Sequence, residues 1–519
     1  MNFIIDRMWK AAQAHPDRPM IVIGNRSWTY GEVWDSARRL AGVIDRESRQ
    51  PIVGFFCDRD ESAYQAIVGI VAAGRCYVPL NPKLNDERLR QIAEMADLDV
   101  VVVGKGKEEA AAKLFADLDV RLVHIGGGDA VAAGRGPGVS RAEIAASPAI
   151  EPRRPADSSA LAYLLFTSGS TGVPKGVPIS NGNLCAYVDH MTAYYGYGPN
   201  DLHAQTCELT FDISVHDMFC AFANGGAIVR IAGVELLAPA RVVRKHGITC
   251  WFSVPSLGSV MSKAHGLEPN TMPSLRVVVF CGEALPVSLA LAWSLAAPNA
   301  LIENLYGPTE ATVAMARHRL DPETSPTVAR AGLVALGKPY PDQNVLVVDD
   351  DMTPLTAPCR GMLLLSGTQL SGSYWKEPRQ TAEKYIRLAG DPDTLWYVSG
   401  DLVEMDEDGC LFFVGRADNQ IKFRGHRIEL NEIEDALRRV LGTDLVVALP
   451  WPKKGHEVDG ITAVAAGTPK PVEPILKMLR EHLPYYMVPH HVSFMKELPR
   501  NMSGKIDRNA ILALLDSGV

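Results

Sequence analysis

The feature that most constrains the fold is a repeated alternation of short apolar runs with segments typical of helices. Runs rich in valine and isoleucine lie at 51–57, 99–104, 248–256 and 276–282, and helix-like segments lie at 61–74, 107–118, 257–266 and 285–296. Repeated pairs of this kind are the pattern of β-α units, which build a largely parallel sheet. We therefore expect residues 1–417 to form a large N-terminal domain of stacked α/β layers.

The pattern changes after about residue 343, where short strands with turn signals replace the alternation. A helix is predicted over 428–440, near the start of the last hundred residues. A chain of 519 residues also exceeds what one hydrophobic core normally supports. We therefore expect a second domain at 418–519, small and of the α+β class.

Charge and cysteine content exclude several classes of protein. The formal net charge of −8 provides no broad basic surface, which argues against a nucleic-acid or membrane-surface partner. The nine cysteines contain no C-x-x-C pair and lie among apolar neighbours, as reduced core residues do. The sequence has neither a signal peptide at its N-terminus nor the roughly 18 apolar residues of a membrane span. A cytoplasmic protein is expected.

The most specific motif is LLFTSGSTGVPKG at 164–176. An apolar strand runs into a loop that offers backbone N–H groups, hydroxyls and one cation, which holding a triphosphate requires. It is not a G-x-x-x-x-G-K-[ST] P-loop, because only two residues separate Gly172 from Lys175. By composition alone such a loop is more often a flexible turn, so its residue order carries the signal. The candidate nucleotide-binding residues are Thr167, Ser168, Gly169, Ser170, Thr171, Gly172 and Lys175.

Seven further motifs accompany this loop. They are TYGEV at 29–33, AAGRCYVPLNP at 72–82, FDISV at 211–215, NLYGPTEAT at 304–312, YVSGDL at 397–402, GRADNQIKFRGHRIEL at 415–430 and NMSGKIDR at 501–508. In this order the chain resembles, over nearly its whole length, the acyl-adenylate-forming family of nonribosomal peptide synthetase adenylation domains, acyl-CoA ligases and firefly-type luciferases. The resemblance implies an enzyme that uses ATP and Mg²⁺ to adenylate a carboxylic acid.

The resemblance also assigns the nucleotide site. It implies that Asn304, Tyr306 and Gly307 hold the adenine, that Asp401 accepts hydrogen bonds from both ribose hydroxyls, and that Arg416 lies near that ribose. These residue types suit the roles, because a carboxylate has two acceptor oxygens and an aromatic ring can pack on a base. Ser399 stands where most members have threonine, and it retains the hydroxyl.

Catalytic roles are implied for three residues. Thr309 is placed beside the phosphates, Glu310 is placed on the magnesium ion, and Lys505 resembles the family's catalytic lysine. A glutamate supplies the hard oxygen that Mg²⁺ prefers, and a cation stabilises the charge that develops on the α-phosphate. Asp418 matches the hinge about which the small domain rotates between adenylation and thiol transfer, so a mobile C-terminal lid is expected.

Phe211-Asp212 indicates the substrate class, because amino-acid-activating members place an aspartate there to pair with the α-ammonium group. A buried carboxylate without its partner costs about 3–5 kcal/mol, so des-amino acids should be rejected. The implied pocket residues are Phe211, Asp212, Ile213, His216, Ser253, Val279, Cys281, Leu305, Val313 and Ala314. Most of these side chains are small or medium in size, so an alanine-sized amino acid is predicted.

Several segments look nearest to the D-alanine:carrier protein ligases, in which a cysteine at the Cys281 position helps define a small pocket. His216 and Leu305 depart from them, since methionine and threonine stand at those positions. His216 either bonds a polar side chain such as serine's hydroxyl or packs as a wall, which leaves D-alanine, L-alanine and serine-like substrates open.

The predicted function is ATP-dependent adenylation of a small amino acid and its transfer to a phosphopantetheine thiol. No carrier motif follows Lys505, so the carrier protein is expected to be a separate molecule. An acyl-CoA ligase for a small carboxylic acid and a catalytically silent nucleotide-binding homologue are the alternatives.

Overall fold

The structure is a computed structural model that describes residues 3–127, 131–169, 173–418, 420–454, 457–500 and 506–517. The chain divides into two compact units. The first comprises Met1–Pro82, Ile92–Phe166 and Gly176–Ala417, and the second comprises Lys83–Gln91, Thr167–Lys175 and Asp418–Val519. Among the described helices, none is long and apolar enough to cross a membrane.

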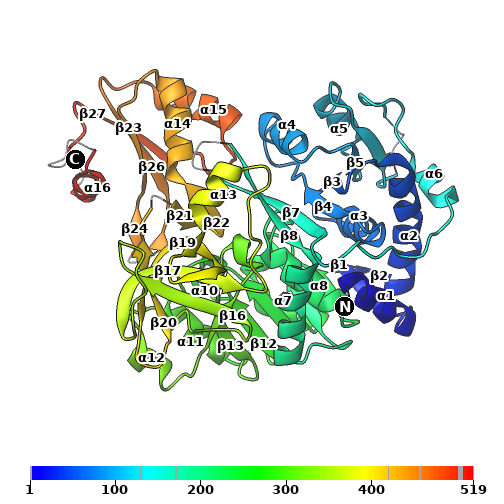
Figure 1. Cartoon of the computed structure of the whole chain (residues 1–519), viewed down its shortest axis with the longest axis horizontal. Helices are drawn as coiled ribbons and strands as arrows, with labels where there is room; N and C mark the ends of the chain where they lie inside the picture. The colour runs from blue at the N-terminus through cyan, green and yellow to red at the C-terminus, as the bar shows by residue number, and fades with distance from the viewer. Residues whose placement is uncertain are drawn as a thin grey trace. The chain divides into compact units, whose positions relative to one another are not determined.

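One sheet of the first unit has the strand order β6-β5-β3-β4-β7-β8. Its strands are β3 (Ile52–Phe56), β4 (Cys76–Pro79), β5 (Val100–Val103), β6 (Arg121–His124), β7 (Leu161–Thr167) and β8 (Lys175–Ser180). The helices of this region are α2 (Tyr30–Glu47), α3 (Glu61–Ala72), α5 (Glu108–Leu114) and α6 (Arg141–Ala146), and α4 (Asp86–Met95) is divided between the two units at Gln91. A capping box of Thr29 and Glu32 begins α2, which packs along α3 (Figure 1).

A larger sheet has the order β15-β14-β13-β12-β11-β9-β10-β1-β2. Its strands are β1 (Pro19–Ile23), β2 (Arg26–Thr29), β9 (Leu202–Gln205), β10 (Ala227–Arg230), β11 (Cys250–Ser253), β12 (Val277–Phe280), β13 (Leu301–Tyr306), β14 (Ala316–Arg319) and β15 (Lys338–Pro339). The accompanying helices are α1 (Ile4–Ala14), α7 (Asn181–Tyr195), α8 (Ile213–Phe222), η1 (Glu235–Leu237), α9 (Pro239–His246), α10 (Pro255–Lys263), α11 (Val287–Ala296), η2 (Thr309–Ala311) and α12 (Ser325–Val328).

The two faces of this sheet belong to different cores, as the alternation of side chains along a strand requires. Trp251 and Val278 pack in a core with Trp293 of α11 and residues of α9 and α10. Cys250 and Phe252 join the main core, which also contains residues of α7 and α8. β11, β12 and β13 are parallel neighbours, so their carboxyl ends meet at one edge of the sheet. Ligands of open α/β sheets bind at such edges.

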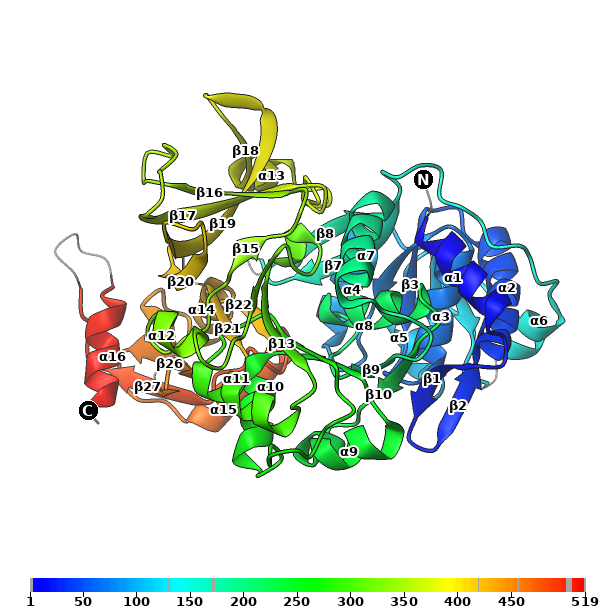
Figure 2. The same ribbon diagram turned by 90° about the horizontal axis from the view of Figure 1, so that it is seen from below.

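An antiparallel sheet completes the first unit (Figure 2). It contains β16 (Gln343–Val348), β17 (Cys359–Gly367), β18 (Tyr385–Leu388), β19 (Asp391–Met405) and β20 (Leu411–Arg416), with α13 (Pro378–Lys384) before β18. The register pairs Asp401 of β19 with Arg416 of β20.

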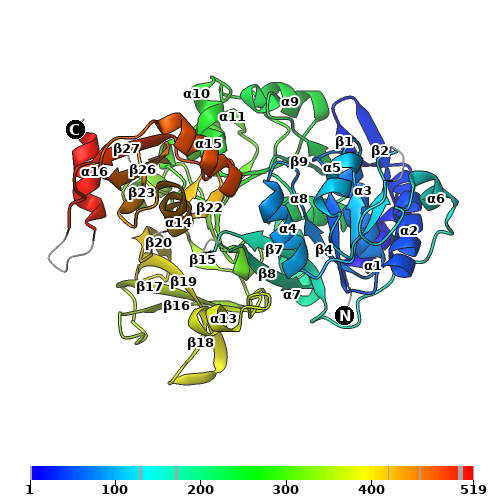
Figure 3. The same ribbon diagram turned by 90° about the horizontal axis from the view of Figure 1, so that it is seen from above.

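The second unit is of the α+β class (Figure 3). Its elements are β21 (Gln420–Phe423), β22 (His426–Glu429), α14 (Leu430–Leu441), β23 (Val446–Pro450), β24 (Lys453–Lys454), β25 (Glu457–Val458), β26 (Ile461–Ala466), α15 (Val472–His482), β27 (His491–Met495) and α16 (Arg508–Asp516). Alternate residues of β23 pack on opposite sides: Val446 and Ala448 with α14 and α15, and Val447 and Leu449 with α16. The α/β fold class predicted from the sequence is confirmed.

Candidate active site

Several predicted substrate-pocket residues lie where β11, β12 and β13 end. Val279, Cys281 and Leu305 are buried and belong to the main core, as do Val313 and Ala314 of the segment that follows β13. They therefore lie on the side of the sheet that faces α7 and α8. Ile213, at the start of α8, is buried in the same core, and Phe211 is partly exposed.

Ser253 does not share that face. Its hydroxyl accepts a hydrogen bond from the Nε1 of Trp251, two residues earlier on β11, with an N–O distance of 3.1 Å. Residues two apart on a strand point to the same face, so Ser253 lies on the side covered by α9, α10 and α11. The neighbouring Phe252 lies on the other side, where its ring contacts His216 edge-on with centroids 4.9 Å apart.

Asp212 lies immediately before α8 and does not cap that helix with its side chain. The side chain keeps some accessible surface, although protein surrounds it. Burial raises the pKa of the Asp212 carboxyl to about 6, and the charge of Glu310 adds to that rise. A hydrogen bond from Thr309 opposes the rise, so the structure brings the predicted ammonium anchor together with the Thr309-Glu310 pair.

Glu310 is fully buried in η2. Its Oε1 accepts a hydrogen bond of 2.7 Å from the hydroxyl of Tyr374, which lies 3.3 Å from the hydroxyl of Tyr397. A phenol is a neutral donor, so this bond orients the carboxylate without cancelling its charge. Tyr374 lies in no motif, so the sequence carries no local signal for its role.

The segment after η2 has an unusual backbone. Thr312 and Val313 have φ values of 54° and 70°, which a β-branched residue rarely adopts. The side-chain amide of Gln369 donates to the carbonyl of Ala314 at 2.7 Å, and the Thr312 hydroxyl donates to the Gln369 carbonyl at 2.6 Å. A Cβ on Gly307 would lie 2.6 Å from the Cα of Ala314, so only glycine permits this close approach.

Three predicted nucleotide-binding residues form one buried cluster: Asp401 and Arg416, predicted at the ribose, and Tyr306, predicted at the adenine. Tyr306 donates its hydroxyl hydrogen to one oxygen of Asp401 at 2.5 Å, and Arg416 donates to the other oxygen at 2.5 Å. The Ser399 hydroxyl accepts from the backbone N–H of Asp401 at 3.0 Å and donates to the Leu363 carbonyl. A carboxylate has about four lone-pair positions, so Asp401 retains acceptor capacity for hydroxyl donors.

Asn304 is buried at the end of β13 beside this cluster. Its Nδ2 donates to the Ala335 carbonyl at 2.8 Å, whereas its Oδ1 is buried without a hydrogen-bond partner. An unsatisfied buried acceptor costs about 1–3 kcal/mol, so a ligand that donates a hydrogen bond here would recover that cost.

His216 projects from α8 and is 1% exposed. Its Nδ1 lies 2.8 Å from the hydroxyl of Tyr187, and its Nε2 lies 3.2 Å from that of Tyr197. Of the two alternatives open from the sequence, this arrangement favours a packed wall, since both ring nitrogens already have partners.

The hydrogen bonds of His216 also argue against a metal site in this region. His203, His216 and Asp217 are buried, with potential ligand atoms within 4.8 Å of one another. Because tyrosine hydroxyls occupy both nitrogens of His216, only two of the three ligands are uncommitted. That is fewer than the four ligands of a structural zinc site or the three of a catalytic one.

The second unit contains the described part of the predicted phosphate loop. The Ser168 hydroxyl donates to the Arg427 carbonyl at 2.6 Å, and the Thr167 hydroxyl lies 3.4 Å from the Lys175 carbonyl. Gly169 is the last described residue of this loop before residue 173. Lys175 is 4% exposed.

The predicted hinge residue Asp418 accepts a hydrogen bond from the backbone N–H of Gln420 at 3.3 Å. Ser170, Thr171, Gly172 and Lys505 lie outside the described residues.

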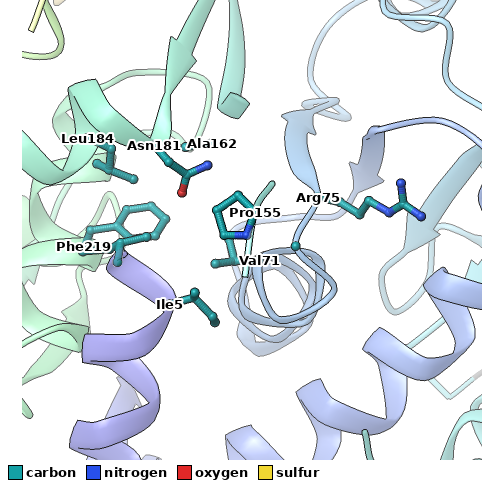
Figure 4. A pocket seen from close by; sticks show the side chains of 10 residues that line it. Ile5, Val71, Arg75, Pro155, Ala162, Asn181, Leu184 and Phe219 are labelled. Atoms are coloured by element: carbon teal, nitrogen blue, oxygen red, sulfur yellow. The ribbon is translucent and has the colours of Figure 1, made fainter. Parts of the chain in front are cut away.

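A small cavity elsewhere in the first unit is not a candidate site. Figure 4 shows that Ile5, Leu184, Phe219 and Pro155 surround it, with Asn181 as its main polar neighbour. Its volume of about 10 Å³ holds at most one water, which is too little for an organic ligand.

The cluster around Asp401 keeps acceptor capacity for hydroxyl groups, which suits it to hold a nucleoside. The chain belongs to the AMP-binding enzyme family, whose sequence model matches residues 8–375. The family match and the relatives identify an AMP-forming ligase.

Individual relatives are of several kinds. The chain is 28% identical over 525 residues to the D-alanine--D-alanyl carrier protein ligase of Lacticaseibacillus rhamnosus, a match covering 98% of each chain. It is 32% identical to the phosphinothricin tripeptide synthetase PhsC of Streptomyces viridochromogenes, covering 96% of this chain and 44% of that one. The crystal structure of the Vibrio cholerae adenylation domain AlmE with glycyl-adenosine-5'-phosphate matches with a TM-score of 0.87 at 27% identity, covering 99% of this chain and 98% of that one.

Proposed function

We propose that this ligase uses ATP and Mg²⁺ to activate a small amino acid, and that it then transfers the aminoacyl group to the phosphopantetheine thiol of a separate carrier protein. The observation that carries the proposal is Asp212, a deeply placed carboxylate beside Thr309 and Glu310. An α-ammonium group is the partner that such a carboxylate needs, because an unpaired buried charge is costly. The D-alanine--D-alanyl carrier protein ligase and the AlmE complex with glycyl-adenosine-5'-phosphate point to small amino acids as well.

In the proposed first step, a carboxylate oxygen of the amino acid attacks the α-phosphorus of ATP. The bond from that phosphorus to the pyrophosphate oxygen breaks, which yields the aminoacyl adenylate and pyrophosphate. In the second step the carrier thiolate attacks the aminoacyl carbonyl, forms the thioester and releases AMP. Asp212 binds the ammonium group throughout, so it positions the carboxylate for the first step and the carbonyl for the second.

The nucleotide roles follow the chemistry of the residues. Asp401 would accept the ribose hydroxyls while Tyr306 and Arg416 hold it in place. The orphan Oδ1 of Asn304 would accept from the exocyclic amino group of adenine. Glu310 would hold Mg²⁺, because a buried carboxylate with a neutral phenol as hydrogen-bond donor is a fitting hard ligand. When bound, the ion would neutralise negative charge on the phosphate groups of ATP.

Two roles in this proposal rest on motifs alone. Lys505 would contact the α-phosphate region during adenylation, and residues 418–519 would rotate as a lid about Asp418 before thiol transfer. A cation at the reacting phosphate lowers the barrier by stabilising developing charge, and its withdrawal afterwards would make room for the thiol.

The substrate's side chain should be no larger than a methyl group. Val279, Cys281 and Phe252 lie on the side of the sheet that faces α8, the helix that carries His216. His216 has no ring nitrogen left for a hydroxyl. In amino-acid-dependent ATP–pyrophosphate exchange, we expect activity with glycine or one enantiomer of alanine. We expect serine to be at least about tenfold poorer in kcat/KM, since its hydroxyl would be buried without a partner. Exchange with propionate but not with alanine would contradict the proposal and favour an acyl-CoA ligase.

The shifted pKa of Asp212 predicts a pH dependence. At pH 7 the carboxyl is mostly ionised and can pair with an ammonium group, and below about pH 6 it is mostly protonated and cannot. We therefore expect kcat/KM for the amino acid to fall toward tenfold per pH unit as pH drops below 6. The KM for ATP, measured over the same range, controls for titration of the nucleotide. A flat amino-acid profile from pH 7 to 5 would contradict the role of Asp212.

A further inference from the structure

His216 lies one helical turn beyond Asp212. The backbone N–H of His216 donates to the Asp212 carbonyl at 3.4 Å, which places the two residues at i and i+4 on one face of α8. A substrate whose ammonium group is held by Asp212 therefore has the imidazole of His216 below it on the same helix face. In the proposed binding mode, the orientation of this ring would set the room that remains for the substrate's side chain.

Two hydroxyls from outside α8 fix that orientation. The hydroxyl of Tyr187, on α7, lies 2.8 Å from Nδ1, and the hydroxyl of Tyr197, just after α7, lies 3.2 Å from Nε2. Burial lowers the pKa of His216 well below its usual value, so the ring is neutral. A neutral imidazole has one donor and one acceptor nitrogen, which two hydroxyls satisfy completely.

Aromatic packing restrains the ring from the sides. The Phe252 ring meets it at 84°, with centroids 4.9 Å apart, and the Tyr197 ring meets it at 81° with centroids 5.8 Å apart. Phe252 is 1% exposed and Tyr187 is 0% exposed, so no solvent can replace a lost hydrogen bond. Any rotation of the imidazole would break both hydrogen bonds and both edge-on contacts.

We propose that Tyr187 and Tyr197 are specificity-determining residues of this enzyme, which act by locking His216 as a rigid wall that limits the substrate to an alanine-sized side chain. They are positioning residues, since they act through His216. The inference rests on the proposed function, because it concerns the amino-acid pocket of that reaction.

The test compares Tyr187→Phe, Tyr197→Phe and the double variant with wild type. The measured quantity is the ratio of kcat/KM for 2-aminobutyrate to kcat/KM for alanine in ATP–pyrophosphate exchange. Loss of one hydrogen bond allows the His216 ring to rotate away from the larger substrate. Each single variant should therefore raise the ratio roughly 2- to 10-fold, and the double variant should raise it further. Tyr64→Phe is the matched control: its hydroxyl is also buried and bonds Gln205 at 2.9 Å, outside this network. In Tyr64→Phe the ratio for 2-aminobutyrate over alanine should equal that of wild type.

A double-mutant cycle separates positioning from general loosening. In a His216→Met background there is no imidazole to hold, so Tyr187→Phe should leave the ratio unchanged. A rise of the same size in both backgrounds would overturn the proposal. If the phenylalanine variants do not fold, ¹⁵N spectra of wild-type imidazoles decide. His216 should show one fixed tautomer with its proton on a single ring nitrogen, and exchange between the two tautomers would overturn the proposal.

The outcomes also distinguish this inference from the proposed function. Wild-type activity with alanine, together with an unchanged ratio in every variant, would overturn only the role of the two tyrosines. If wild type supports no exchange with any small amino acid, the proposed function fails and the inference fails with it.

Discussion

Replacing Asp212 with asparagine should lower kcat/KM for the amino acid by about 10²- to 10³-fold. Asparagine preserves the shape of the side chain and can still accept from Thr309, so the change removes mainly the negative charge. An ammonium group that loses its buried counter-charge is destabilised by about 3–5 kcal/mol, which corresponds to this range or more. The same variant should narrow the preference for alanine over propionate. ATP–pyrophosphate exchange with both acids measures both effects.

Asp217→Asn is the control for this experiment. Asp217 lies on the same helix and is 1% exposed, and burial raises its pKa well above the usual value. Burial thus favours the neutral form of this carboxyl, and Asp217 is not among the residues predicted to contact substrate or nucleotide, so the amide should leave kcat/KM near wild type. If Asp212→Asn and Asp217→Asn have equal effects, the loss reflects damage to α8, and the assignment of Asp212 as ammonium anchor is wrong.

Replacing Asp401 with asparagine should weaken both nucleotide binding and the fold. Asp401 and Arg416 form an ion pair whose side chains are only 5% and 10% exposed. Removing one charge of a buried pair leaves the other uncompensated, so the free energy of unfolding should fall by about 3–5 kcal/mol. The KM for ATP should rise, because the amide has one acceptor oxygen where the carboxylate has two, and its NH₂ group cannot accept from a ribose hydroxyl. Urea unfolding with and without AMP separates the two effects.

An exposed ion pair provides the comparison for Asp401. Arg379 and Glu383 lie one turn apart on α13, with side chains 90% and 59% exposed. Exposed pairs contribute about 0–1 kcal/mol, so Glu383→Gln should scarcely change either the unfolding curve or the KM for ATP. If Asp401→Asn were as mild as Glu383→Gln, the cluster around Asp401 would not be the nucleotide site that we propose.

The repeated β-α units were predictable because their signals are local. The run at 276–282 contains β12 (Val277–Phe280), and the helix predicted over 428–440 is α14 (Leu430–Leu441). A strand buried on both faces must be apolar along its length, and a helix must repeat its apolar residues every three or four positions. Both patterns can therefore be recognised without the tertiary structure.

The parts of the site that the sequence did not reveal depend on side-chain direction and on tertiary contacts. Ser253 stands one residue from Phe252, and a shift of one position along a strand moves a side chain to the opposite face. Tyr187, Tyr374 and Gln369 lie in no recognised motif, since their partners are far away in the chain. Only the folded chain brings a tyrosine of α7 to an imidazole of α8.

The left-handed turn at Thr312 and Val313 has a consequence for recombination between related enzymes. Its shape depends on Gly307 before it and on Gln369 more than fifty residues later, so the turn is not encoded by its own residues. A loop exchange that transplants 304–314 alone would separate the turn from the amide that holds it. Chimeras that carry Gln369 along with the loop should keep the backbone conformation of the enzyme that donated the loop. Grafts of residues 304–314 alone should carry the donor's side chains on a backbone of different conformation.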